Sequence, residues 1–421
     1  MAELLYDETG RLLFTEEMRK EYKILIPAMA PYHFEYFVHM LKSEGYDAEV
    51  LENTSFDVIH EGMKYSHNDI CVPAMLVIGQ FIDAIKNGGY DVNKVALIIT
   101  QTGGGCRASN YLALIRKAFK NAGYEYIPII SVNAVGLENN PGFKITTNVL
   151  LKLVTGLMMG DLLMQLYNEI IPYEVNKGET ERVYQEVNKY LNEYFYLPSR
   201  KVFYHPTRLF EKVVKRFSEI EVDKSIKKPK VGIVGEIYVK YSPLGNNNLE
   251  ETLRREGCEV ITPNLLDFIQ YTFDSSRHDI YKYGGRRIVA LIYRFLIRFI
   301  EYRRNRVRRQ CKKYGFRVFT NYYDLRKMAK DYMPHAMHVG EGWLLTAEMI
   351  ELINIGSPNI VCAQPFGCLP NHIAGKAMIS KLKRNYRESN IVAIDYDTSA
   401  TEINQLNRIK LMISNAQSNL K

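Results

Sequence analysis

Two separate blocks of the sequence alternate short apolar runs with longer amphipathic patterns. A run of about four to eight apolar residues bounded by turn residues is typical of a buried strand, and apolar spacing of three and four residues is typical of a helix. Because strands that alternate with helices pair in parallel, each block predicts a parallel sheet covered on both faces. The predicted strands are 23–29, 48–51, 94–100 and 127–132 in the first block and 231–237, 259–262, 359–363 and 391–396 in the second, and the predicted helices are 33–43, 73–86, 110–122, 248–256, 343–353, 372–385 and 401–416.

The chain is too long for one hydrophobic core. Its 421 residues suit two or three domains. Between the two blocks the pattern turns helical, and a lysine-rich segment, 223–230, leads into the second block. We therefore predict an α/β protein with a first α/β domain at 1–145, a helical region at 146–228, and a second α/β domain at 229–421 that carries a helical insertion at about 267–333.

Neither of the two most apolar segments is long and uncharged enough for a membrane span. The segments 149–164 and 288–300 are interrupted by charged residues, among them Asp161 and Arg294, whereas a span needs about 20 predominantly apolar residues. We expect both segments to form buried or half-buried helices. The first fifteen residues mix acidic and apolar side chains and lack a secretory pattern. These features predict a cytoplasmic protein with no membrane contact.

Much of the positive charge lies in one segment. The formal net charge is +8, and the excess is concentrated in residues 286–313, which include Arg303, Arg304, Arg306, Arg308 and Arg309. A basic patch is one sign of nucleic-acid binding, but apolar residues at helical spacing here indicate an amphipathic helix instead. We interpret the charges first as a solvated helix face, with docking to an acidic partner or an anionic substrate as the alternative. We expect no nucleic-acid partner.

The two blocks share a Gly–Cys pair just beyond one strand. A strand of the first block runs into Gln101 and then the segment GGGC at 103–106, and a strand of the second runs into Gln364 and then the segment PFGC at 365–368. Open α/β sheets bind ligands beyond the carboxyl ends of their strands. The repeated arrangement therefore predicts two similar modules whose Gly–Cys loops face one site.

A cysteine at the start of a helix is suited to metal binding. The helix N-terminus carries unpaired N–H groups and a partial positive charge, which lower the thiol pKa and favour the thiolate that a metal requires. Cys71, with Pro73 in the first turn of a predicted helix, offers a third such position beside Cys106 and Cys368. We predict that these three cysteines converge on a metal centre.

The remaining cysteines fit such a centre less well. Cys362 lies within a predicted strand and is the weaker candidate for a fourth ligand. Cys258 and Cys311 occupy no comparable loop, and we interpret both as buried structural residues. That buried role is the simplest alternative for any single cysteine, and zinc is the alternative metal, although the chain lacks the CxxC pairs that structural zinc commonly uses.

Other residues of these loops are candidates for binding or proton transfer. Glycine before a cysteine leaves room for a bound group and presents an N–H donor. A glutamine at a strand end either donates to a bound group or caps the turn, and a histidine at a helix start either donates a proton or serves as a cap. The cofactor-binding candidates are Gly104, Gly105 and Gly367; the catalytic candidates are Gln101, Gln364, Glu341 and His372, with Asn371 beside them.

A nucleotide-binding interpretation of the glycine loop is weak. Gly103 and Gly105 fit part of the dinucleotide fingerprint, but that fingerprint belongs to the first βα turn, and no acidic residue ends the next strand. The sequence also contains no GxxxxGK[ST] loop. We therefore do not expect this chain to hydrolyse ATP by itself.

Four separated motifs stand out, and most of the candidate residues lie in three of them: NDICVPA at 68–74, QTGGGCRASNY at 101–111, GEIYVKY at 235–241 and QPFGCLPNH at 364–372. In this order the motifs resemble the 2-hydroxyacyl-CoA dehydratase component family, and the resemblance covers essentially the whole chain. It is strongest to the form found at the C-terminal end of long chains that also carry an ATP-dependent activator.

The resemblance implies two Rossmann-like domains with an iron–sulfur cluster between them. Matched motif by motif, the ligands of a [4Fe–4S] cluster would be Cys71, Cys106 and Cys368. The family further implies an ATP-dependent activator as electron donor, an acyl-CoA or other small-molecule substrate, and a homo- or heterodimer. A related branch holds an [8Fe–9S] double-cubane cluster, which requires six thiolates, and this larger cluster is the alternative.

Two functions follow from the resemblance. In the first, the chain is an enzyme component, either a lyase of the 2-hydroxyacyl-CoA dehydratase type or a low-potential reductase. In the second, it holds a cluster as a non-catalytic electron carrier or scaffold.

Overall fold

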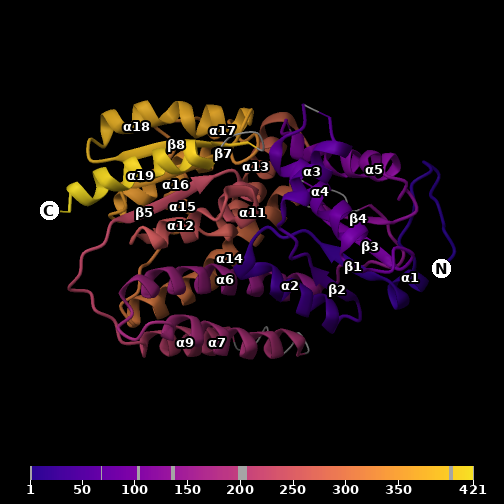
Figure 1. Cartoon of the computed structure of the whole chain (residues 1–421), viewed down its shortest axis with the longest axis horizontal. Helices are drawn as coiled ribbons and strands as arrows, with labels where there is room; N and C mark the ends of the chain where they lie inside the picture. The colour runs from indigo at the N-terminus through magenta and orange to yellow at the C-terminus, as the bar shows by residue number, and fades with distance from the viewer. Residues whose placement is uncertain are drawn as a thin grey trace.

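The computed structural model of the chain is a mixed α/β structure built around two four-stranded parallel sheets (Figure 1). It describes residues 2–67, 69–101, 105–133, 138–197, 206–397 and 402–420, without the side chains of Gln101, Asn133 and Pro206. The first third of the chain lies mainly on the right of Figure 1 and the last third on the left, and the helices of residues 147–218 form a layer below them.

Both sheets have the same strand order. The first sheet contains β1 (Lys23–Ile26), β2 (Asp47–Val50), β3 (Val95–Gln101) and β4 (Ile129–Asn133) in the order β2-β1-β3-β4, and the second contains β5 (Lys230–Gly235), β6 (Glu259–Ile261), β7 (Asn359–Pro365) and β8 (Asn390–Tyr396) in the order β6-β5-β7-β8. All neighbouring strands are parallel. The predicted pair of parallel sheets is therefore confirmed, and each sheet changes its winding direction at its centre, between β1 and β3 or between β5 and β7.

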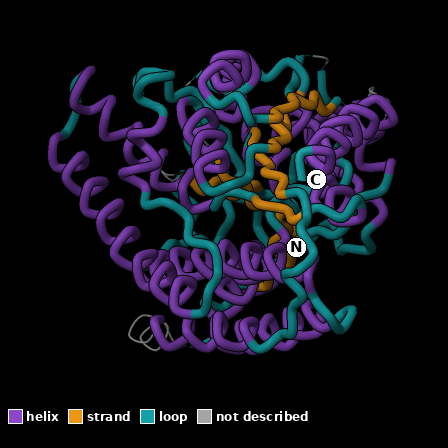
Figure 2. Tube along the Cα trace, turned by 90° about the vertical axis from the view of Figure 1, so that its left-hand side faces the viewer, coloured by secondary structure: helices purple, strands orange, loops and turns teal. Residues whose placement is uncertain are grey.

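Helices enclose the strands on all sides (Figure 2). The order of elements follows the prediction, whereas the division into three domains stays a prediction. The helices are α1 (Glu16–Glu21), α2 (Pro31–Ser43), α3 (Phe56–Tyr65), α4 (Val72–Asn87), α5 (Tyr111–Asn121), α6 (Thr147–Ile170), α7 (Glu179–Tyr196), α9 (Pro206–Ser218), α10 (Ile237–Tyr241), α11 (Pro243–Asn246), α12 (Leu249–Arg255), α13 (Leu265–Tyr283), α14 (Arg287–Lys313), α15 (Tyr322–Met328), α16 (Trp343–Asn354), α17 (Leu369–Ala374), α18 (Ile379–Asn385) and α19 (Glu402–Ser418).

One predicted helix is broken in the structure. The single helix expected at 372–385 is divided into α17 and α18 at Gly375, where the backbone leaves the helical conformation (φ −99°, ψ −83°). A Cβ at this position would lie 2.8 Å from the carbonyl oxygen of Asn371 and 3.1 Å from the Cys362 sulfur. Glycine therefore allows the chain to turn close beneath the cysteine of β7.

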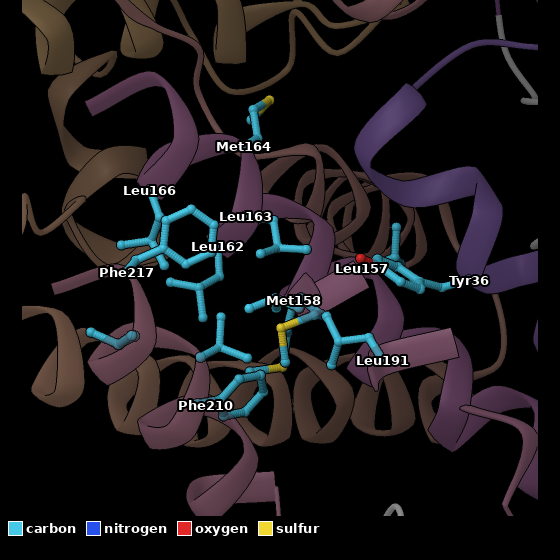
Figure 3. Close-up of a cluster of buried hydrophobic side chains, with 14 of the residues drawn as sticks. Tyr36, Leu157, Met158, Leu162, Leu163, Met164, Leu166, Leu191, Phe210 and Phe217 are labelled. Carbon is cyan, nitrogen blue, oxygen red and sulfur yellow. The ribbon is translucent and has the colours of Figure 1, made fainter. Parts of the chain in front are cut away.

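The helix α6 is the centre of the helical layer. Its residues, including Leu157, Met158 and Leu162, pack with side chains of α2, α7 and α9 in one buried apolar cluster (Figure 3). Among the described residues, the stretch Thr147–Tyr173 is long and apolar enough to cross a membrane, but 72% of its most apolar window is buried inside the protein. The prediction of a buried helix at 149–164 is thus confirmed.

The basic helix α14 meets its two expectations in part. The segment 288–300 is half-buried as expected: Ile297 and Ile300 are buried, whereas Phe295 is 66% exposed. Not all of the arginines are solvated, because Arg303 and Arg304 are buried, and Arg304 forms ion pairs inside the protein with Asp267 and Glu301, residues of α13 and α14. Helix α14 therefore packs through apolar and charged residues and leaves a further apolar stripe at the surface.

A buried acid on α16 makes the stability of the fold depend on pH. Glu351 is 1% exposed and accepts a hydrogen bond from the Thr320 N–H at 2.7 Å. Burial, with a further contribution from the charge of Asp267, raises the pKa of Glu351 from 4.5 to about 7. The ionised form is therefore the less favourable one in the folded chain.

We expect Glu351→Gln to reduce the stability that the chain loses as the pH rises from about 4.5 through about 7. Because the pKa of Glu351 is higher in the folded than in the unfolded chain, its stabilising contribution is complete below about pH 4.5 and is lost as the pH rises through about 7. At about pH 8 the variant should exceed the wild type by up to about 3 kcal/mol, measured by urea unfolding. A gain of the same size at pH 5, or in the exposed control Glu221→Gln, would contradict this cause.

The helices α3 and α4 cross at backbone contact. Gly62 of α3 and Gly79 of α4 lie at the crossing, and a Cβ at Gly79 would overlap the carbonyl oxygen of Val58. No side chain fits between the two helices at this point. The position of α4, which begins directly after Cys71, therefore depends on this crossing.

We predict that Gly79→Ala destabilises the chain by about 2–4 kcal/mol, because the added methyl group forces the two helices apart. The matched control is Gly156→Ala in α6, where the nearest atom to a Cβ is the Tyr36 Cβ at 3.5 Å. That change should be neutral or stabilise by up to about 1 kcal/mol through helix propensity. Thermal or urea unfolding of both variants measures the difference, and equal stabilities would refute the close crossing.

Candidate metal centre

The three predicted ligands each precede a helix. Cys71 is the N-cap of α4, Cys106 is the N-cap of a 3₁₀ helix that leads into α5, and Cys368 is the N-cap of α17. Pro73 lies in the first turn of α4, as the sequence predicts. All three thiols are free and half-buried. The structure thus places each cysteine where its helix presents unpaired N–H groups.

The two halves of the chain meet beside these cysteines. Tyr238, which follows β5 in the second sheet, packs into the apolar core of the first half. A Cβ on Gly105, next to Cys106, would lie 3.5 Å from the Val339 side chain of the second half. Helix α4 also contacts α11 of the second half. The loop after β3 therefore approaches the segment before α16 across this junction.

The three thiols share one electrostatic environment. Burial is the largest cause of a raised pKa for each of Cys71, Cys106 and Cys368, and the carboxylate of Glu236 adds to all three. The pKa of Cys106 rises to about 11, with contributions from the charges of Glu341, Glu236 and Cys71. The sequence had predicted lowered thiol pKa values at helix starts, which is wrong for this chain without a bound cation, because burial outweighs the helix-end field.

Each sulfur has at least one hydrogen-bond donor. The Tyr111 hydroxyl lies 3.2 Å from Cys71 Sγ, the Ala108 N–H donates to Cys106 Sγ at 3.5 Å, and the Asn371 Nδ2 donates to Cys368 Sγ at 3.4 Å. Donors of this kind stabilise a thiolate over a thiol, since the negative charge on sulfur is partly neutralised. The surroundings of the three sulfurs therefore suit thiolate ligands.

Glu341, one of the catalytic candidates, is fixed and buried. Its side chain is 6% exposed; Oε1 accepts from the Ile237 N–H at 3.0 Å and Oε2 from Asn371 Nδ2 at 3.2 Å. The glycines on both sides adopt positive φ, and a Cβ on Gly342 would overlap the Met337 carbonyl oxygen. Glu341 thus connects the start of α10 with α17 through hydrogen bonds.

Glu236 is a residue of this site that sequence reasoning missed. It follows the last residue of β5, and its Oε2 accepts from the Val239 N–H at 2.9 Å. Burial and the neighbouring charge of Glu341 raise the pKa of Glu236 to about 8. The signal was available, because Glu236 stands at the carboxyl edge of a strand, but the predicted strand 231–237 ran past it.

A buried ion pair lies behind the two acids. Lys240 Nζ is 2.9 Å from Glu348 Oε1, with side-chain exposures of 3% and 1%. The Lys240 charge lowers the pKa of Glu236 and Glu341 and so offsets part of the burial effect. Removing it would leave three carboxylates close together without their nearest cation.

The remaining candidate residues form a second group at the edge of the second sheet. Gln364 Nε2 donates to His372 Nδ1 at 3.2 Å and also to Asp395. Lys376 completes the group through Asp395 Oδ2 at 2.9 Å. Gln364 is therefore a connecting residue between β7, β8 and α17, and His372 is held beside it in a half-buried position.

The remaining glycine and cysteine positions named from the sequence have different surroundings in the structure. Gly367 has φ +69°, which a side chain rarely allows, so glycine is required before Cys368. Cys362 lies inside β7, paired with Ala393, and is fully buried away from the strand end. Cys258 and Cys311 are buried in apolar clusters, as expected. Gly104 and the side chain of Gln101 lie outside the described residues.

No single-ion site is formed in the part of the chain that the structure describes, where no group of three or more His, Cys, Asp or Glu side chains is arranged to hold one metal ion. The thiolate ligands of a cubane cluster bind separate iron atoms, so they lie farther apart than the ligands of one ion. The donor set of three half-buried thiols, each with a hydrogen-bond donor, therefore fits a cluster better than a zinc ion.

Comparison with known proteins assigns no family. None of the protein-family models matches the chain, and no curated protein matches it either.

We predict that Lys240→Met destabilises the chain by about 3–5 kcal/mol, because it leaves the buried Glu348 without the cation that compensates it. The matched variant Lys240→Met with Glu348→Leu removes both charges and should recover most of that loss. Urea unfolding at neutral pH gives both values. A double variant as unstable as the single one would show that the lost packing, and not the unpaired charge, is the cause.

Proposed function

We propose that the chain is the iron–sulfur component of a 2-hydroxyacyl-CoA dehydratase-like system in the cytoplasm. In this proposal it accepts a low-potential electron from an ATP-dependent activator and uses it at a [4Fe–4S] cluster for radical dehydration or for reduction of a small substrate. The observation that carries the proposal is the common surroundings of Cys71, Cys106 and Cys368, which come from both halves of the chain and share the field of Glu236.

The residues around the thiols suit this role. When bound, the cluster would supply a centre that takes up one electron at low potential. The chain itself contributes the three sulfur ligands and at least one hydrogen-bond donor to each of them. Glu236 and Glu341 lie beside the thiols, and their raised pKa values favour the protonated acids. With a pKa of about 8, Glu236 can hold a proton on Oε1 at neutral pH, while Oε2 accepts from Val239.

The strand order supports the finer part of the fold proposal. A sheet in the order 2-1-3-4 is that of doubly wound Rossmann-like domains, which bind ligands at the central switch point. Cys106 follows β3, Cys368 follows β7 and Glu236 follows β5, which are the switch-point strands of the two sheets. We therefore place the cluster between two Rossmann-like domains.

The positions of the other cysteines favour one cubane over the double cubane. A six-thiolate cluster would require Cys258, Cys311 and Cys362 as well, but these three are buried in a strand or in apolar clusters. The chain therefore offers three sulfurs to a cluster. The fourth iron position would be open to the substrate, an acyl-CoA or another small molecule, and the functional unit would be a homo- or heterodimer.

The test is anaerobic purification followed by iron and acid-labile sulfide analysis. We expect a brown protein with about four iron atoms and about four sulfides per chain. Cys106→Ser should lose both, whereas Cys258→Ala, the buried control, should retain them. A colourless wild-type protein that contains only zinc would refute the proposal, and about eight iron atoms per chain would favour the double cubane.

Substrate binding separates an enzyme from a carrier. The reduced protein should change its paramagnetic spectrum when an acyl-CoA thioester or a small reducible molecule is added, because the open iron position then acquires a new ligand. An unchanged spectrum with every candidate would favour the cluster-holding scaffold.

A further inference from the structure

The segment 106–111 joins two of the proposed ligands to each other. It begins with Cys106 and ends at Tyr111, whose hydroxyl lies 3.2 Å from Cys71 Sγ. The Arg107 guanidinium, in the same segment, donates to the carbonyl oxygen of Asp69, two residues before Cys71. One short segment therefore carries a ligand and also fixes the loop that carries the next ligand.

The direction of the Tyr111–Cys71 hydrogen bond follows from the state of the sulfur. A thiolate has no proton to donate, so the phenolic O–H is the donor when Cys71 is a metal ligand. Tyr111 is the first residue of α5, and the 3₁₀ helix before it runs directly from Cys106, so the ring cannot move independently of that ligand. The fold therefore places the Tyr111 hydroxyl within hydrogen-bond distance of the Cys71 sulfur.

We propose that Tyr111 is a positioning residue that raises the reduction potential of the cluster by donating a hydrogen bond to Cys71 Sγ. This inference rests on the proposed function. Hydrogen bonds to cluster sulfurs withdraw negative charge from the iron and stabilise the reduced state. Tyr111 therefore favours electron uptake by the cluster.

Tyr111 is also the donor that can be removed most cleanly. The donor to Cys106 is a backbone N–H. The donor to Cys368 is Asn371, whose amide also binds Glu341, so its removal would disturb the buried acid. The Tyr111 hydroxyl bonds to Cys71 among the described residues, and phenylalanine keeps the shape of the ring.

The experiment is a redox titration of the reconstituted full chain, followed by paramagnetic resonance, for the wild type and Tyr111→Phe. We expect the iron content to be unchanged. At a fixed solution potential the ratio of reduced to oxidised cluster should fall by roughly tenfold in the variant, which corresponds to about 59 mV for one electron. An unchanged ratio at normal iron content would overturn the inference and leave the proposed function intact.

Tyr271→Phe is the matched control. The Tyr271 hydroxyl lies in the same region but donates to the Gly340 carbonyl oxygen at 2.9 Å, not to a sulfur. A general effect of losing a hydroxyl near the site would shift both variants, and that result would contradict a specific role for Tyr111.

Two further measurements keep the inference testable if the first variant loses its cluster. Replacement of Tyr111 by 3-fluorotyrosine retains the hydroxyl and makes it a stronger donor, so the reduced fraction should rise; no change would overturn the inference. In the metal-free chain, the pH profile of Cys71 alkylation should shift to higher pH in Tyr111→Phe, because the thiolate loses its donor. If the wild type binds no iron at all, the proposed function fails, and this inference fails with it.

Discussion

The structure depends on the meeting of two parallel sheets at their carboxyl edges. In a parallel sheet every strand ends at the same edge, so the loops that follow β3 and β1 lie close together, as do the loops that follow β7 and β5. Of the three candidate cysteines, the edge of the first sheet carries only Cys106. Because Tyr238 and α11 of the second half pack against the core of the first half, the second edge is held opposite and contributes Cys368, Glu236 and Glu341. The proposed three-sulfur site would therefore depend on the junction, because neither sheet alone carries its residues.

The junction buries ionisable side chains, which destabilises the fold. Glu341 and Glu348 are almost completely inaccessible, and such carboxylates destabilise a fold unless hydrogen bonds or cations compensate them. Glu341 has two donors, and Glu348 has Lys240. The compensation is incomplete, since the pKa values of Glu236, Glu341 and Glu348 all remain raised, mainly by burial. Raised pKa values mean that these carboxyls bind protons more readily than they would in water, so protonation limits the remaining cost of their burial.

The sequence predicted the sheets well because their signals are local. Apolar runs bounded by turns identified all eight strands, and a cysteine followed by an early proline identified the start of α4. The break at Gly375 and the burial of Arg304 were not predictable in this way, because each depends on a tertiary neighbour, Cys362 in one case and Asp267 in the other. Glu236 and Tyr111 were missed for the same reason: their importance comes from sulfurs far away in the chain.

The position of Cys71 shows how a distant packing contact can act on the site. Cys71 has no sheet edge of its own; it is fixed by α4, by the Tyr111 hydroxyl and by the Arg107 contact to its loop. Helix α4 is in turn fixed by its backbone crossing with α3 at Gly79, where no methyl group fits. A change at Gly79 would therefore displace the helix that begins directly after Cys71. Because only four residues separate Tyr111 from Cys106, this displacement would act on the spacing of the two cysteines. The crossing of the two helices thus constrains the proposed metal centre, although Gly79 is not part of it.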